Sequence, residues 1–203
     1  HPYQDSDGEY AERSKNYARV NNSAFIEVGR LLDKPELFDL VRKSLDLTYY
    51  HMEPNGEVIT NNSRRQDQFS VQSIIGSYLF YRYLAIRDND GKLAAVAKTI
   101  EGLDGFESQI LDRSLASFLD EPLLQKYLPE PVLMPVNYER VYTESKLVRI
   151  RRGDTTTTLF GGNDWPLIIA SGRSHIPNFF AYRKGDAILR YMRYSTRFFS
   201  TGY

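Results

Sequence analysis

The segment 128–135 (LPEPVLMP) constrains the fold of this chain most, because it carries three prolines in eight residues. Proline fixes φ and lacks an amide hydrogen, so this segment cannot continue a helix and favours an extended connector. Apolar residues recur at helical spacing before it and at a period of two beyond it. Helices first and strands later predict an α+β chain rather than alternating βαβ units.

Before the connector, the hydrophobic spacing predicts several helices joined by short turns, arranged as a bundle or a toroid of hairpins. The first places Val20, Val28 and Leu31 on one apolar stripe. In the second, Asp33 and Glu36 predict a capping box around Pro35. The predicted helices cover residues 20–32, 33–52, 69–86, 88–100 and 106–119.

Beyond the connector, β-branched, aromatic and alternating apolar residues predict an antiparallel sheet. The turn at 184–186 (KGD) separates two of its strands. The predicted strands cover 146–154, 155–160, 166–171 and the two halves of 178–194. The chain therefore divides into a helical part (1–128), a proline-rich connector (129–137) and a sheet part (138–203).

The composition excludes several classes of function. The 203 residues carry 26 Lys and Arg against 26 Asp and Glu, so no overall field recruits nucleic acid or an acidic membrane. The absence of cysteine excludes thiolate catalysis and cysteine-bound metals, and three histidines make an imidazole metal site unfavourable. No apolar run approaches the roughly 20 residues that span a bilayer. Because the chain starts at His1 rather than at Met, we expect a piece of a longer protein.

The stretch 7–17 (DGEYAERSKNY) is dense in reactive side chains. Tyr10, Ser14 and Tyr17 are spaced by four and three residues, so they share a face if a helix has begun. Their hydroxyl groups are then either hydrogen-bonded within the packed interior or part of a functional site. Asp5 and Asp7 alternate before Gly8, but the remaining ligands of an EF-hand loop are missing, which favours a plain turn.

Two further stretches carry candidate binding groups. In 61–69 (NNSRRQDQF), Arg64 and Arg65 form either a forked donor array for a carboxylate or sulfate or part of a solvated loop. Near 171–180, Arg173 lies beside His175, which disfavours the charged imidazole and suits it to accept a proton; the alternative is a polar surface loop. The sequence contains no GxSxG, HExxH, P-loop or dinucleotide fingerprint.

The order of these stretches resembles the heparinase II/III-like proteins. DGEYAERSKNY leads into helical hairpins, PNGEV and SRRQD follow, and a proline connector precedes KLVRIRRGD. The resemblance implies an interior slice of such a protein: an incomplete (α/α) toroid followed by an antiparallel β-sandwich. Members with known activity cleave acidic polysaccharides by β-elimination, whereas the SRRQD loop is similar to one in uncharacterised members.

The resemblance also implies roles for single residues. Tyr17 corresponds to the catalytic tyrosine, and His175 is what remains of a turn that supplies a catalytic histidine and, in some members, a zinc ligand. Because the other histidines of that turn are missing, no zinc or other cofactor is predicted. The candidate substrate-binding residues are Arg13, Asn62, Arg64, Arg65 and Arg173.

The predicted partners are an acidic polysaccharide or oligosaccharide and the remainder of the same longer chain. Nucleic acid and a membrane span are not expected, and a periplasmic or secreted location follows from the resemblance. Two other functions remain open. One is a noncatalytic glycan-binding or structural member of the same fold, and the other is an interaction module without a sugar site.

Overall fold

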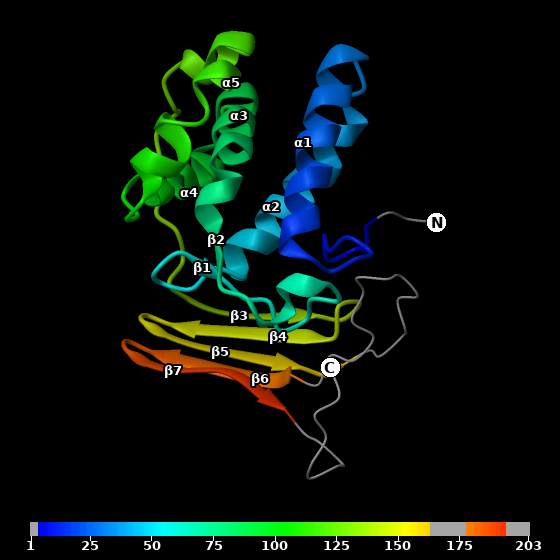
Figure 1. Ribbon diagram of the computed structural model, residues 1–203, viewed down its shortest axis with the longest axis vertical. Helices are drawn as coiled ribbons and strands as arrows, with labels where there is room; N and C mark the ends of the chain where they lie inside the picture. The colour runs from blue at the N-terminus through cyan, green and yellow to red at the C-terminus, as the bar shows by residue number, and fades with distance from the viewer. Residues whose placement is uncertain (1–3, 163–177, 194–203) are drawn as a thin grey trace.

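The computed structural model describes residues 4–162 and 178–193. A layer of helices covers one face of a five-stranded sheet, and a loop with two very short strands lies between them (Figure 1). The prediction of an α+β chain is confirmed.

The helices form two hairpins followed by short turns. In the first, α1 (Lys15–Leu31) packs against α2 (Glu36–Tyr50), and in the second, α3 (Tyr78–Asp88) packs against α4 (Gly91–Glu101). The remaining helical segments are α5 (Leu115–Asp120), the 3₁₀ turns η1 (Gln66–Phe69), η2 (Ile74–Ser77) and η4 (Pro122–Gln125), and the π-type turn η3 (Glu107–Leu111). Their shared core is apolar and includes Val41, Leu45, Ile74, Leu84, Val96 and Ile100.

Three predicted helices differ from the structure. The capping box is wrong, because Asp33 has a φ of 50° and lies in the turn that ends α1, so α2 begins at Glu36 without a side-chain cap. Residues 70–73 are not helical, since β2 (Gln72–Ser73) pairs with β1 (Glu57–Val58), and residues 74–77 form the 3₁₀ turn η2 instead of the start of an α-helix. The stretch 106–119 is interrupted between η3 and α5.

The sheet is an antiparallel meander in the order β3-β4-β5-β6-β7. Its strands are β3 (Asn137–Tyr142), β4 (Leu147–Arg152), β5 (Thr155–Phe160), β6 (Asn178–Lys184) and β7 (Ala187–Arg193). The strands predicted at 146–154, 155–160 and 178–194 are therefore confirmed. The predicted strand at 166–171 lies outside the described residues. The proline segment is neither helix nor strand, as its composition predicts.

The two faces of the sheet differ in chemistry. On the face toward the helices, the most deeply buried side chains include Arg149, Thr156, Thr158 and Arg183. On the outer face, cross-strand partners form one apolar row over all five strands, made of Val141, Val148, Leu159, Phe180 and Met192. Val141 is 61% exposed and Leu159 is 42% exposed. Buried apolar side chains such as Leu147 and Phe160 share the inner face with these polar groups, whereas the outer apolar row is partly exposed.

Within the described ranges, the helices are too short or too polar for any of them to cross a membrane.

Candidate functional site

The N-terminus of α1 and the loop 59–70 meet at Tyr17 and Arg65. Tyr17 lies in the first turn of α1 and is half-buried. Nη2 of Arg65 donates a hydrogen bond of 2.8 Å to the Tyr17 hydroxyl, and the guanidinium carbon lies 4.2 Å from the centre of the tyrosine ring. Nη1 of Arg65 also lies 3.4 Å from a carboxylate oxygen of Glu12. The guanidinium is thus in place to stabilise negative charge that develops on the Tyr17 oxygen.

The buried carboxylate of Asp67 connects the same two segments. One oxygen accepts hydrogen bonds from the Ser14 hydroxyl (3.1 Å) and from the backbone amide of Lys15 (2.8 Å) at the start of α1. The other accepts a hydrogen bond from the Ser63 hydroxyl in the loop. A negative charge at a helix N-terminus is favourable, so this carboxylate stabilises α1.

The structure places the other predicted substrate-binding residues at different depths. Arg64 is half-buried next to Arg65 in the chain. Arg13 is 9% exposed, and its Nη2 lies 3.4 Å from the backbone oxygen of Glu144. Asn62 is fully buried, and its amide nitrogen donates to Glu9 at 2.8 Å. Arg173 and His175 lie outside the described residues. Tyr17 and Arg65 are therefore brought together, whereas Asn62 lies in the interior.

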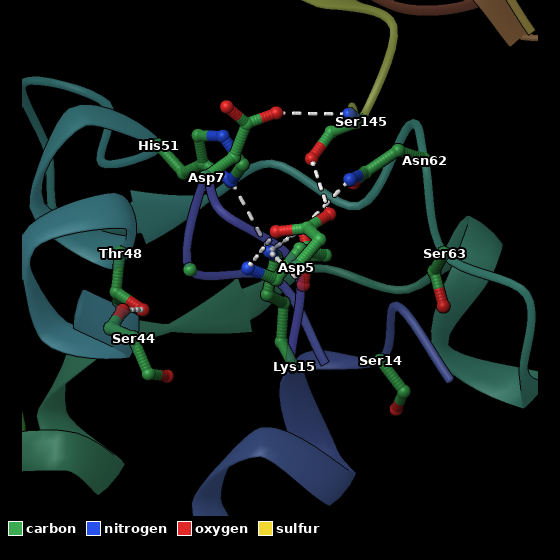
Figure 2. A network of polar contacts seen from close by, with 12 residues as sticks. Asp5, Asp7, Ser14, Lys15, Ser44, Thr48, His51, Asn62, Ser63 and Ser145 are labelled. Atoms are coloured by element: carbon green, nitrogen blue, oxygen red, sulfur yellow. Dashed lines mark hydrogen bonds and ion pairs between the residues drawn. The ribbon is translucent and has the colours of Figure 1, made fainter. Parts of the chain in front are cut away.

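A buried group that the sequence analysis missed surrounds the Lys15 side chain at the start of α1 (Figure 2). The Lys15 ammonium is 3.2 Å from a Glu9 carboxylate oxygen and 3.1 Å from Nδ1 of His51. Because an ammonium can only donate, Nδ1 of His51 accepts and the imidazole proton is on Nε2. Burial, followed by the charges of Lys15 and Arg149, lowers the pKa of His51 well below its ordinary value of 6.5. His51 is therefore a neutral interior group near pH 7.

No sequence pattern pointed to this group, because its members are far apart in the chain. Lys15 lies in the dense stretch 7–17, but its contact to His51 spans 36 residues. A lysine in the first turn of a helix and a histidine just after the next helix match no known ligand or catalytic spacing.

The turn at Asp5–Gly8 fastens the N-terminal segment to the β3–β4 turn. The Asp7 carboxylate accepts from the backbone amides of Glu144 and Ser145, each at 2.9 Å. The Asp5 carboxylate accepts from the Ser145 hydroxyl at 3.2 Å and from the Glu9 amide at 2.8 Å. Figure 2 shows Ser145 pointing toward both aspartates. The prediction of a plain turn is confirmed, and both carboxylates have structural partners.

Metal-binding groups do not gather in the described part of the chain. Residues 4–162 and 178–193 contain no cluster of three or more His, Asp or Glu side chains that could hold a metal ion. The one described imidazole with resolved contacts, His51, faces a lysine ammonium.

A second polar cluster lies between β1 and the strands β6 and β7. The Oε2 atom of Glu57 lies 2.8 Å from Nη2 of Arg183 and 2.8 Å from Nη2 of Arg190. Partial burial raises the pKa of Glu57, but the hydrogen bonds from Arg190 and Asn55 and the charge of Arg183 outweigh it, so the pKa is lowered. The enclosed cavity here measures about 30 Å³, room for about two water molecules. This cluster is an internal ion-pair network rather than a saccharide site.

No protein-family model matches the chain, and no curated protein and no solved structure matches it either. The proposed function therefore rests on the contacts among the described residues and on the sequence pattern.

Proposed function

We propose that the protein acts on uronate-containing acidic polysaccharides as a heparinase II/III-like lyase, with Tyr17 as its proton-transfer residue. The observation that carries this proposal is the hydrogen bond from Arg65 to the Tyr17 hydroxyl at 2.8 Å. A phenol that gives up its proton needs a cation beside its oxygen, and Arg65 supplies one from a buried, fixed position.

The reaction is a β-elimination. A base removes the proton on C5 of the uronate, a double bond forms between C4 and C5, and the bond from C4 to the glycosidic oxygen breaks. Tyr17 delivers its proton to that leaving oxygen, and the resulting phenolate is stabilised by Arg65. Such proton transfer contributes roughly 10²- to 10⁴-fold to the rate. His175 is the proposed partner base.

The substrate carboxylate must be neutralised, because negative charge develops on it as the C5 proton leaves. Arg64 and Arg173 are the proposed partners of this carboxylate, since a guanidinium binds a carboxylate through two parallel hydrogen bonds. Arg65 acts on Tyr17 instead, because its guanidinium is already engaged with the tyrosine and Glu12. Arg13 lies near the same helix start and supports the positive potential.

Two uncovered apolar surfaces support the finer fold of this proposal, an incomplete (α/α) toroid with a β-sandwich. On α1, Val20, Val28 and Leu31 are 60%, 41% and 69% exposed, although they form the stripe that the sequence predicts to be packed. On the sheet, the outer apolar row borders a hollow of about 420 Å³ lined by Val141, Val148 and Leu159. Further helices and a second sheet from a longer chain would cover these surfaces.

The proposal is tested by incubating the purified protein with a panel of uronate-containing polysaccharides and following the ultraviolet absorbance of the unsaturated uronate product. We expect Tyr17→Phe to lower kcat by about 10²-fold or more, because it removes the transferred proton. Tyr127→Phe is the matched control, since Tyr127 is 98% exposed and remote from α1 in the chain.

Equal turnover of Tyr17→Phe and the wild-type protein would exclude the proposed role of Tyr17. Saccharide binding without product on any member of the panel would favour the noncatalytic glycan-binding function. The absence of both binding and product would favour an interaction module.

A further inference from the structure

The Asp67 carboxylate accepts hydrogen bonds from the two segments that carry Tyr17 and Arg65, the start of α1 and the loop 59–70. Asp67 is 2% exposed, and its Oδ2 faces Ser14 and the amide of Lys15, with the Asn16 amide further away at 3.4 Å. These groups form the first turn of α1, which also contains Tyr17. The N-cap hydroxyl of Ser14 in turn accepts from the Tyr17 amide at 3.3 Å.

On the other side, Oδ1 of Asp67 accepts the hydroxyl proton of Ser63. The Ser63 oxygen then accepts from the backbone amide of Arg65 at 3.3 Å. The turn is closed by the Gln68 amide, which donates to the Arg65 backbone oxygen at 3.1 Å. One carboxylate thus anchors the backbone of Arg65 through Ser63 and the backbone of Tyr17 through Ser14.

We propose that Asp67 is the positioning residue of the Tyr17–Arg65 pair, holding the tyrosine hydroxyl and the guanidinium in register through Ser14 and Ser63. The Asp67 carboxylate forms hydrogen bonds with Ser14, Lys15 and Ser63, so its effect on proton transfer from Tyr17 is indirect. The kinetic consequence rests on the proposed lyase function, whereas the geometric consequence does not.

Asp67→Asn separates positioning from simple loss of a cap. An asparagine oxygen can still accept from the Lys15 amide, but its amide nitrogen then faces Ser63 as a donor. The Ser63 hydroxyl proton loses its acceptor, and Arg65 loses a fixed anchor. Ser63→Ala is the second variant, because it removes only the connection to Arg65 and leaves the cap of α1 in place.

The chain offers a matched control in Asp90, which caps α4. Its carboxylate accepts from the backbone amides of Lys92 at 2.7 Å and Leu93 at 3.1 Å. Asp90→Asn therefore makes the same chemical change at a helix N-terminus in another hairpin. A loss that follows only from weakening a helix cap appears in both aspartate variants.

The geometric test uses fluorine NMR of the protein with 3-fluorotyrosine incorporated only at position 17. Arg65→Ala first defines how far the resonance moves when the guanidinium is gone. We expect Asp67→Asn and Ser63→Ala to move it in the same direction, and Asp90→Asn to leave it in place. An unmoved resonance in Asp67→Asn and Ser63→Ala, with both folded, would overturn the proposal whether or not the protein is a lyase.

The kinetic test applies to a polysaccharide that the wild-type protein cleaves. We expect Asp67→Asn to lower kcat about 10- to 100-fold, the size of effect expected from a displacement of about 1 Å. KM should change by less than about 3-fold, because the proposed substrate carboxylate partners are other residues. A fall in kcat of the same size in Asp90→Asn would overturn the proposal. If no substrate is cleaved, the lyase function fails, and the resonance still decides the positioning role.

Discussion

The two faces of the five-stranded sheet depart from the usual arrangement, because the inner face buries charges among apolar residues such as Leu147 and Phe160 and the outer face leaves an apolar row exposed. The face packed on the helical layer contains a fully buried Arg149, which lies 3.0 Å from Glu53 and donates to Thr158 at 2.9 Å. The face directed away from the helices has the apolar row that begins at Val141. An ordinary two-layer protein buries the apolar face and exposes the polar one.

This difference indicates that directional hydrogen bonds, as well as buried apolar area, hold the helices on the sheet. Arg149 also donates to the backbone oxygens of Tyr50 and Met52, at 3.1 and 3.2 Å, where α2 ends. Hydrogen bonds with fixed geometry allow one register of the sheet beneath α2, whereas apolar contacts tolerate sliding. This register is what brings the β3–β4 turn to the segment that precedes Tyr17.

The largest expected effect is on the inner face. Arg149→Met removes the 3.0 Å ion pair to the buried Glu53 and the donor to the Met52 backbone oxygen, so we expect a loss of about 3–5 kcal/mol in the free energy of unfolding. Urea unfolding followed by circular dichroism measures it. Arg152→Met is the control on the same strand, because Arg152 is 57% exposed. Equal losses in the two variants would contradict the contrast between the faces.

The next effect concerns His51, whose ring packs edge-on against Tyr142 of β3 at 5.4 Å. The lowered pKa keeps the folded His51 neutral, so below its ordinary value of 6.5 the unfolded chain binds one more proton. The contribution of neutral His51 to the free energy of unfolding is therefore fully present above pH 6.5 and decreases as the pH falls below this value. From about pH 7 to about pH 5, His51 alone removes about 2 kcal/mol.

His51→Asn keeps an acceptor for Lys15 and abolishes this titration. We expect the free energy of unfolding of the variant to fall less steeply with acid than that of the wild-type protein, by about 2 kcal/mol over that interval. All other titrating groups are common to the two proteins. Parallel pH profiles would show that His51 takes up its proton over the same pH range in the folded and the unfolded protein.

The smallest effect compares two neighbouring residues of β5 that point to opposite faces. Thr158→Val removes an acceptor of Arg149, and we expect it to cost about 1 kcal/mol. Thr157→Val changes the outer face, and we expect a change within about 0.5 kcal/mol of zero. Chemical denaturation of the pair measures both. A larger loss at Thr157 would mean that the outer face is already packed in this chain.

The sequence predicted the fold best where local geometry decides it. The prolines of 128–135 mark the change from helices to strands, and the turn at 184–186 separates two strands, because proline and glycine act on their own backbone. The prediction failed at 70–73 because Gln72 pairs with Val58, a contact that apolar spacing does not encode. The capping box failed because Asp33 is needed to end α1, and two local signals competed for the same residue.

The candidate site was partly predictable. The dense stretches pointed to Tyr17, Arg64 and Arg65, and the structure places Tyr17 against Arg65 across 48 residues of chain. The contacts of Asp67 to Ser14 and Lys15 span more than 50 residues and follow only from the tertiary fold. The same holds for Lys15 and His51, which meet because α1 and α2 are antiparallel. A sequence shows which side chains are charged or reactive, but the tertiary packing decides which of them come into contact.

The fastening of Asp7 to the β3–β4 turn has a consequence for synthesis. Asp7 leaves the ribosome more than a hundred residues ahead of Glu144, its partner 137 positions later. The helices α1 to α5 are complete before that turn exists. Domains generally fold as units during translation, with the N-terminal part first. The contacts of Gln4 and Glu9 to the helical layer can therefore form first, and the contact of Asp7 is added when the β3–β4 hairpin has been synthesised.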